Sequence, residues 1–377
     1  KAYIFGDKHD YNKTRLFAQY LKKHHIEIFN LKEDMSVNGT DFKRGNAYIV
    51  PSKQFQYRMI QTVFEPVKEF YDSVFYDASA WTIALAFDMP YARMSTPDLG
   101  NEVTNHDLSP KRRFVEKSKY AYLFDWSDYA APKALNYLQE KGVFTKVAAK
   151  PFTIEKDGQN RDFNYGSIMV SIADQHIDSD ELYEHVLRAS QIANIEIVAV
   201  ETGANVEGPY LGSRNFAALS KPKIVMLLGD GVSGYEAGEV WHLLDTKLNM
   251  PITKVDILNF GRLDLEDYST LILTSGRYQR LTEGEVMKIR KWTEKGGTLI
   301  ALRQATNWAI RQGIAKETIK KGTTNGNTSR YDFVTARDRR GSLAIGGSIY
   351  ETSIDISHPL AFGYHRRTLP VYRNHSI

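Results

Sequence analysis

KIVMLLGDG at residues 223–231 is an apolar run that ends abruptly in a turn with two glycines. Such a run before a glycine turn is typical of a buried strand. Apolar residues then recur at the spacing of one helical face, from Val240 to Leu248, and residues 252–258 read as a second strand. The order strand, helix, strand is therefore the unit from which we predict the fold.

The same pattern occurs twice more toward the N-terminus. AYIFGD at residues 2–7 precedes one helical pattern, and AYLFD at residues 121–125 precedes another. A further strand follows each unit, at residues 47–50, 167–172 and 270–273. Alternation of strands with helices favours parallel sheets joined by right-handed crossovers. We therefore predict an α/β protein of repeated open parallel-sheet units, the last with additional antiparallel strands.

The chain length supports several such units. At 377 residues the chain is long enough for two or three domains. Polar joins at residues 95–113 and 220–222 predict boundaries that give three units, 1–109, 110–220 and 221–377. The chain begins at Lys1 almost within the first strand, so we expect a piece of a longer protein.

Composition excludes several classes of function. The net charge of +4 is small for this length and provides no electrostatic footprint for nucleic acid. No apolar run approaches the roughly 20 residues of a membrane helix, so we expect no transmembrane segment. The absence of cysteine excludes disulfides, thiolate zinc sites and a cysteine nucleophile.

Gly229, Gly231 and Gly234 form a G-x-G-x-x-G pattern between a strand and a helix, the context of a nucleotide-binding fingerprint. That mechanism needs a positive helix end that faces the diphosphate. Glu236 and Glu239 lie in or next to the first turn of the helix and would repel it. We favour a tight strand-to-helix turn and keep Gly229–Gly234 as a weak candidate nucleotide site.

An aspartate follows the opening strand of each unit, at Asp7, Asp125 and Asp230. In open α/β sheets, ligands bind at the carboxyl ends of the strands. We therefore expect any ligand of these loops to be cationic or polyhydroxylated rather than anionic. Aspartate also caps helices, which is the alternative interpretation.

GGTLIALRQA at residues 296–305 follows a helical pattern and reads as a turn, a buried strand and the start of a helix. This stretch resembles the strand and nucleophile elbow of class I glutamine amidotransferase-like domains, which belong to the flavodoxin-like parallel-sheet type. In that family a cysteine stands just past the strand. The matching positions here are Arg303, Gln304 and Ala305, so the resemblance implies a degenerate elbow without amidotransferase chemistry.

Other candidate residues have simpler explanations. Ser275 and Thr306 could replace the missing nucleophile, but each fits a turn or helix cap better. His24 and Glu27 have the H-x-x-E spacing of some zinc sites, yet they stand where a helix runs into a strand, so we predict no metal site. His358 is interpreted as an ordered loop residue.

Two stretches resemble the region that follows the peptidase domain in large bacterial zinc carboxypeptidase-like proteins of the carboxypeptidase A-type metallopeptidase family. They are residues 48–58 with Phe64-Glu65, and the aromatic-rich residues 70–87. Those proteins are similar in carrying an amidotransferase-like domain at the C-terminus. Residues 234–242 and 358–364 fit that domain. The resemblance is weaker in the middle unit.

The resemblance implies a secreted or periplasmic parent hydrolase that removes C-terminal residues from peptides with zinc. The zinc ligands and catalytic residues of that family would precede Lys1, so none is assigned here, and no cofactor is expected in this chain. The chain would be a non-catalytic accessory region that packs on its own peptidase domain or binds a peptide or carbohydrate. Two alternatives stay open: an independent hydrolase or transferase with a non-cysteine nucleophile, and a nucleotide-binding module.

Overall fold

The computed structural model describes the whole chain except residues 67–81, 320–331, 337, 339–343 and 377. The chain forms two compact units. Unit 1 comprises Lys1–Ala131, Phe144–Ala218 and Ser329–Ile377, and unit 2 comprises Pro132–Val143 and Leu219–Thr328. The expected boundaries after residues 109 and 220 stay a prediction.

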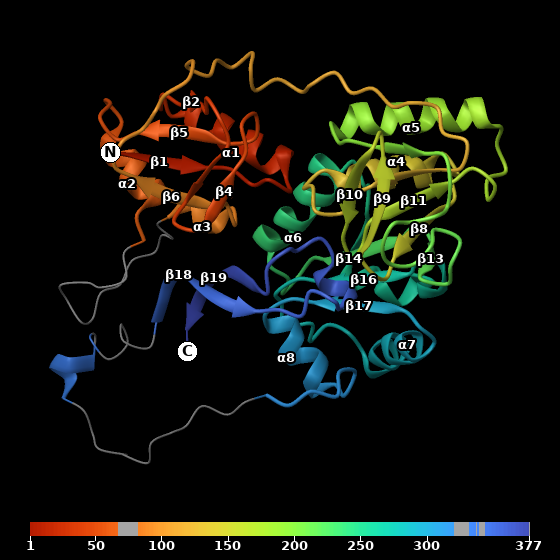
Figure 1. Cartoon of the computed structure of the whole chain (residues 1–377). Helices are drawn as coiled ribbons and strands as arrows, with labels where there is room; N and C mark the ends of the chain where they lie inside the picture. Colours follow the sequence, from red (N-terminus) through yellow and green to blue (C-terminus); the bar gives the residue numbers. More distant parts are fainter. Residues whose placement is uncertain (67–81, 320–331, 337, 339–343, 377) are drawn as a thin grey trace. The chain divides into compact units, whose positions relative to one another are not determined.

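The first sheet of unit 1 has four strands in the order β2-β5-β1-β6, and every neighbouring pair is antiparallel. The strands are β1 (Ala2–Phe5), β2 (Phe29–Asn30), β5 (Tyr48–Pro51) and β6 (Tyr91–Met94). Helix α1 (Tyr11–Lys23) joins β1 to β2, and a small hairpin of β3 (Met35–Val37) and β4 (Thr40–Phe42) precedes β5 (Figure 1). Helices α2 (Tyr57–Phe64) and α3 (Ile83–Ala86) lie between β5 and β6 in the chain.

The second sheet of unit 1 has five strands in the order β12-β7-β11-β8-β13. They are β7 (Ala121–Phe124), β8 (Thr145–Ala148), β11 (Ile168–Ser171), β12 (Val198–Val200) and β13 (Phe216–Leu219). The pairs β12–β7, β7–β11 and β11–β8 are antiparallel. A hairpin of β9 (Phe152–Lys156) and β10 (Gln159–Phe163) precedes β11, and helices α4 (Ala131–Glu140) and α5 (Ser179–Ala193) are the connections.

These two sheets share one topology, which differs from the predicted parallel units. In each, the first strand lies between the third and the fourth, and the second pairs with the third. This is the split β-α-β arrangement. The alternation of strands and helices predicts that consecutive strands run the same way, but it does not say whether they are neighbours. Here another strand separates them, so all the neighbouring pairs described above become antiparallel.

Unit 2 contains the one four-stranded parallel sheet, in the order β15-β14-β16-β17. Its strands are β14 (Ile224–Leu228), β15 (Thr253–Asp256), β16 (Thr270–Leu273) and β17 (Thr298–Ala301), with helices α6 (Gly234–Trp241), α7 (Glu283–Glu294) and α8 (Gln304–Arg311). The order second, first, third, fourth is the start of the flavodoxin-like order. The mixed α/β class and the parallel sheet of this region are confirmed.

An antiparallel pair near the C-terminus belongs to unit 1. Strand β18 (Ala344–Ser353) pairs with β19 (Thr368–Ser376), so additional antiparallel strands occur in this part of the chain. The loop between them packs on the second sheet through Phe362, which stacks on Tyr165. Gly166 has φ of +86°, and a Cβ there would lie 2.7 Å from Cβ of Phe362, so the contact requires glycine.

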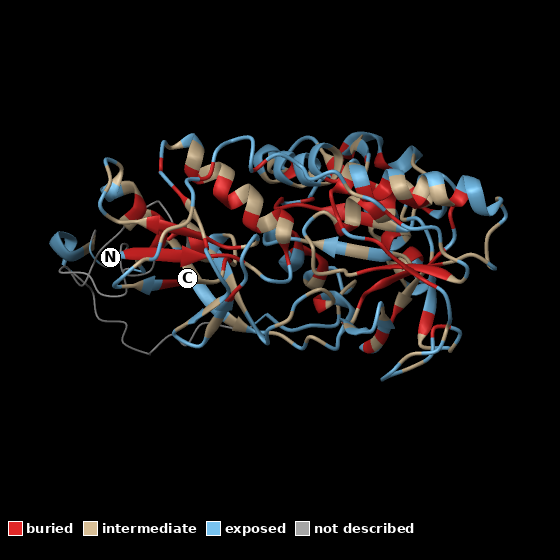
Figure 2. Cartoon of the chain, turned by 45° about the horizontal axis from the view of Figure 1, so that its top comes forward, coloured by how far each residue is buried: buried red, intermediate tan, exposed pale blue. Residues whose placement is uncertain are grey.

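Aromatic side chains fill the core beside the first sheet. Phe5 and Phe17 meet edge to face with ring centroids 5.0 Å apart, and Tyr3 stacks on Phe64 at 4.9 Å. Strand β1 is buried along its whole length (Figure 2). Each buried ring contributes roughly 1.5–3 kcal/mol of transfer free energy, which anchors the loop that follows β1. The aromatic residues between Phe70 and Trp81 lie outside the described residues.

Helices of the described ranges are too short or too polar to cross a membrane.

Candidate functional site

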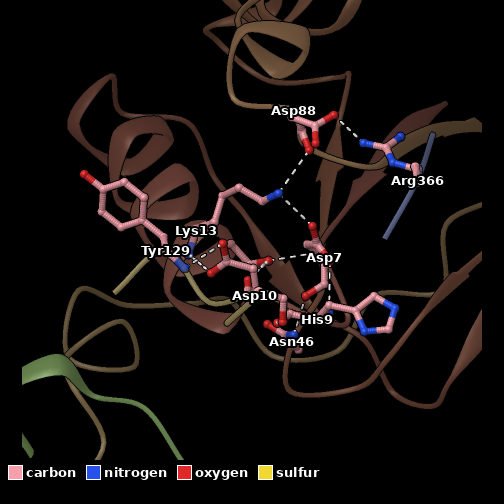
Figure 3. A network of polar contacts seen from close by, with 10 residues as sticks. Asp7, His9, Asp10, Lys13, Asn46, Asp88, Tyr129 and Arg366 are labelled. Atoms are coloured by element: carbon pink, nitrogen blue, oxygen red, sulfur yellow. Dashed lines mark hydrogen bonds and ion pairs between the residues drawn. The ribbon is translucent and has the colours of Figure 1, made fainter. Parts of the chain in front are cut away.

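The loop after β1 holds an ion pair that is largely shielded from water. The Lys13 ammonium lies 2.7 Å from the Asp7 carboxylate, and the two side chains are only 19% and 15% exposed. Lys13 also donates to the backbone oxygen of Asp88 at 3.2 Å, so it lies between Asp7 and Asp88 (Figure 3). Burial alone would raise the pKa of Asp7, but the charge and hydrogen bond of Lys13 outweigh it and lower that pKa.

Further bonds fix this loop from three sides. The Asp7 N–H donates to Thr14 Oγ1 at 2.8 Å, and Asn46 donates to the Asp7 carbonyl at 2.6 Å. Arg366, in the segment between β18 and β19, pairs with the Asp88 carboxylate. Because its polar groups are engaged within unit 1, Asp7 serves the fold rather than offering a free carboxylate.

Two more carboxylates, Asp10 and Asp128, come together from the loops after β1 and β7. Asp10 is 4% exposed and accepts from the N–H groups of Lys13 at 2.8 Å and Tyr129 at 3.0 Å. Burial and the nearby Asp128 raise the pKa of Asp10 to about 8. Burial also raises the pKa of Asp128, against a hydrogen bond from Asn12 that lowers it. The pair therefore favours holding a proton at neutral pH.

Asn12, which is 2% exposed, joins these loops to the end of α5. Its amide donates to Asp128 at 2.8 Å and to the carbonyls of Ala193 and Asn194 at 3.1 and 3.3 Å. Arg113 donates to the Asn194 carbonyl at 2.9 Å from the other side. The two sheets of unit 1 are thus joined by buried polar contacts.

A pair of stacked histidines stands beside this network. The rings of His9 and His365 are 3.7 Å apart at 17°, and His365 Nδ1 lies 3.2 Å from the Asn164 amide. Burial lowers the pKa of both imidazoles, and for His9 the neighbouring His365 lowers it further. Both rings are therefore neutral at pH 7.

Two adjoining cavities open around these residues and form one groove, because both are lined by His9, Asp125, Asp162 and Phe163. The first has a volume of about 390 Å³, and its further charged lining comes from Lys8, Arg44, Lys111, Arg113, Asp128, Arg161 and Glu196. The second has a volume of about 480 Å³, and its further polar lining comes from Thr153, Asn164, Glu207 and His365. The groove lies at the carboxyl ends of β1 and β7, where the sequence predicted ligand-facing aspartates, and Asp125 is the predicted one that lines it.

The predicted elbow region of unit 2 lies between a strand and a helix, and its role as a degenerate nucleophile elbow stays a prediction. Arg303 follows β17 and precedes α8, and its φ and ψ of 51° and −114° lie outside the regions that non-glycine residues normally occupy. Such strain is characteristic of a nucleophile elbow. Gln304 and Ala305 begin α8, and Ala305 is buried. The strained position therefore carries an arginine.

The Arg303 guanidinium is engaged in an ion pair with α6. It lies 2.7 Å from Glu236, whose carboxylate is 15% exposed and also accepts from the Ser275 N–H at 2.9 Å. The loops after β14 and β16 are joined by bonds from Ser233 N to the Ser275 carbonyl and from Arg277 N to the Gly231 carbonyl. A ligand at this switch point of the sheet would have to displace these contacts.

The alternative nucleophiles are engaged in local structure. Thr306 Oγ1 donates to the carbonyl of Ala301, the last residue of β17, at 2.8 Å. Ser275 is 9% exposed, and its backbone takes part in the loop contacts above. His358 belongs to unit 1, where its Nδ1 accepts from Leu360 N at 3.2 Å and begins a short 3₁₀ helix.

The glycine fingerprint has acidic surroundings. Gly229 has φ of +105°, and a Cβ there would lie 2.8 Å from the Asp256 carboxylate. Gly231 and Gly234 have open space where a side chain would be. Asp230 pairs with Arg280 at 2.7 Å. Within this turn, the carboxylates of Asp256 and Glu236 leave an unfavourable field for a diphosphate.

No cluster of three or more His, Asp or Glu side chains in the described ranges is arranged to hold a metal ion. His24 ends α1, with its N–H donating to the Leu21 carbonyl, and its ring packs on Tyr20. His9, Asp10, Asn12 and His365 were not among the residues that the sequence pattern predicted as ligand-binding. The sequence signal that could have pointed to this site is the Asp-Tyr pair that follows both AYIF at residues 2–5 and AYLF at residues 121–124.

Comparisons with protein-family models, with curated proteins and with solved structures find no match to this chain.

Proposed function

We propose that this chain is a non-catalytic binding region, the accessory part of a zinc carboxypeptidase-like protein. One observation carries the non-catalytic part. The strained elbow position, where an amidotransferase-like domain would hold its nucleophile, carries Arg303, and its guanidinium is paired with Glu236 at 2.7 Å.

An arginine cannot perform the chemistry of that position. Its guanidinium stays protonated in proteins and offers only donors, so it cannot attack a carbonyl carbon. The Glu236 carboxylate, in the first turn of α6, would repel the developing oxyanion of an acyl transfer next to Arg303. These two residues stabilise each other and favour a binding or packing role over turnover.

The carboxypeptidase part of the proposal rests on the resemblance of residues 48–58, 234–242 and 358–364. It predicts a peptidase domain as the natural partner of this chain, with zinc held by that domain. The same resemblance favours a secreted or periplasmic protein.

The test compares this chain with the longer protein encoded by its complete reading frame. Elemental analysis measures zinc, and chromatography measures release of C-terminal residues from model peptides. We expect one zinc and peptidase activity in the longer protein, and neither in this chain. Stoichiometric zinc or peptide hydrolysis by this chain alone would overturn the non-catalytic role. Absence of both from the longer protein would remove the carboxypeptidase assignment.

A second measurement examines the elbow. Arg303→Ala removes the guanidinium, and Arg303→Lys keeps a positive charge at the same place. We expect no ester or amide hydrolysis in the parent chain or either variant. Activity that appears in the parent chain and is lost in both variants would assign a catalytic role to this position.

A further inference from the structure

We propose that the groove of unit 1 binds a small zwitterion, an amino acid or short peptide, with its carboxylate at one end and its ammonium at the other. The inference rests on the proposed binding role and narrows it to a ligand class. The groove is the pair of adjoining cavities of about 390 and 480 Å³ that share His9, Asp125, Asp162 and Phe163.

The basic residues of the groove all line the first cavity, which also contains Asp128, Glu196 and the two shared aspartates. Lys8, Arg44, Lys111 and Arg113 line the first cavity, and Arg161 there is already paired with Glu196 at 2.6 Å. Within the described ranges, Arg44 and Lys111 have no ion pair. The Lys111 ammonium lies 4.5 Å from the centre of the Tyr11 ring, which positions it without neutralising it. This end is suited to a carboxylate.

The other end is acidic. Asp125, Asp162 and Glu207 line the second cavity, and no lysine or arginine does. Asp125 accepts from Ser127 N at 2.9 Å, and Asp162 accepts from Thr153 Oγ1 at 2.7 Å. Neither forms an ion pair in the part of the chain that the structure describes, and the same holds for Glu207. This end is suited to an ammonium.

The residues shared by the two cavities are Asp125 and Asp162 together with His9 and Phe163, so the acidic lining continues into the first cavity. His9 lines both cavities and stacks on His365, and burial keeps both rings neutral at pH 7. A simple anion would gain beside the basic residues of the first cavity but meet Asp125 and Asp162 next to them. A simple cation would gain at the acidic end but would meet the lysine and arginine side chains of the first cavity next to it. A ligand with both charges matches the field along the whole groove.

The first experiment is isothermal titration of the whole chain with glycine and its oligomers of two to four residues. Each added residue lengthens an extended peptide by about 3.5 Å, so the series varies only the separation of the charges. We expect one length to bind more tightly than its neighbours. Blocking that oligomer by N-acetylation or by C-terminal amidation should weaken it about tenfold in each case, because each block removes a charge-assisted contact. Phosphocholine, which also carries both charges but is not an amino acid or peptide, is titrated for comparison.

Variants then test which end of the groove binds the carboxylate of the oligomer and which binds its ammonium. Lys111→Gln should weaken the oligomers that keep a carboxylate and leave the amidated one unchanged. Glu207→Gln should weaken those that keep an ammonium and leave the acetylated one unchanged. Lys53→Gln and Glu317→Gln, which change the charge of residues that line neither cavity, are the controls and should alter nothing. Thermal unfolding confirms that each variant is folded.

Several results would overturn the inference: no binding of any oligomer at millimolar concentration, equal binding of free and blocked forms, or tighter binding of phosphocholine than of any oligomer. If a variant does not fold, the blocked oligomers still decide the matter. Zinc and hydrolysis results for the longer protein are independent, so failure here and failure of the proposed function can be told apart.

Discussion

The loops after β1 and β7 start from nearly the same sequence and reach different electrostatic states. Ala-Tyr-Ile-Phe at residues 2–5 and Ala-Tyr-Leu-Phe at 121–124 form interior strands of two sheets with the same order. An Asp-Tyr pair follows each, at residues 10–11 and 128–129. In the first loop the preceding carboxylate, Asp7, is paired and largely buried.

In the second loop the corresponding carboxylate is left unpaired. Counted from the Asp-Tyr pair, Lys13 and Thr14 of the first loop correspond to Ala131 and Pro132, which cannot donate to Asp125 through their side chains. Among the described residues, Asp125 accepts from the Ser127 N–H and forms no ion pair, and it lines the groove. The difference teaches that two or three side chains decide whether a loop carboxylate stabilises the fold or faces a ligand.

The largest expected effect comes from making the first loop like the second. Lys13→Met removes the cation and leaves the Asp7 carboxylate with little water and no ion pair. We expect unit 1 to lose about 3 kcal/mol of unfolding free energy, as is found when one member of a buried pair is removed. Urea unfolding followed by tryptophan fluorescence measures it.

Lys23→Met is the matched control, since Lys23 is exposed at the end of the same helix and should cost less than about 0.5 kcal/mol. Adding Asp7→Asn to Lys13→Met should recover part of the loss. Equal stability of Lys13→Met and the parent chain would mean that the pair does not hold the loop.

The next effect concerns the bonds that join the two loops. Asn12→Ala removes the donor to Asp128, Ala193 and Asn194 and leaves these acceptors buried. We expect a loss of about 2 kcal/mol, since unsatisfied buried groups carry most of the cost. Asn12→Asp, which keeps the volume but adds a carboxylate beside Asp128, should be worse than Ala. If Asn12→Asp were more stable than Asn12→Ala, the orientation given above for the Asn12 amide would be wrong.

The raised pKa of Asp10 predicts that the free energy of unfolding depends on pH, with a smaller effect than that of the two substitutions above. Asp10 has a pKa of about 8 in the fold and an ordinary low value when unfolded, so the folded chain binds the extra proton. Stability should therefore fall as pH rises toward 8, by about 1 kcal/mol between pH 6.5 and pH 7.5. His9 and His365 act oppositely, but mainly below pH 6.5, because burial lowers their pKa.

Asp128→Asn tests whether Asp10 is the group responsible for this pH dependence of stability. It keeps an oxygen for Asn12 and Ala130 and removes the charge that raises the pKa of Asp10, so the slope above pH 6.5 should become shallower. Unfolding curves at four pH values measure it. An unchanged slope would assign the dependence to another group.

The sequence predicted where the strands lie in the chain better than it predicted which strands are neighbours in a sheet. The apolar runs at residues 2–5, 121–124 and 224–228 are strands, and the expected parallel sheet occurs in unit 2, although the sequence did not predict the order of its strands. The antiparallel pairing in unit 1 could not be read from the alternation, because it depends on which strand enters between β1 and β2. The position of Arg303 between a strand and a helix was predictable from a local glycine turn, strand and helix.

The groove was only partly predictable for the same reason. Asp125 was a candidate because it ends a strand, a local feature. The contact of His9 with His365 joins residues more than three hundred positions apart, and no periodic pattern records it. The raised pKa of Asp10 arises first from burial and then from the nearby Asp128 charge, which are properties of the tertiary structure.

The smallest effect tests how closely the two loops depend on each other. Ser127 and His9 each precede the Asp-Tyr pair of their loop, and Ser127 Oγ donates to the His9 carbonyl at 3.1 Å. Because this bond is exposed, water can replace it, and Ser127→Ala should cost about 0.5 kcal/mol. The same change frees the backbone that carries His9, so it should weaken binding of the glycine oligomers more than it weakens the fold. Titration and urea unfolding of one preparation compare the two. A loss confined to stability would mean that the loops meet for packing alone, whereas a loss confined to binding would show that the second loop positions the imidazole at the junction of the groove.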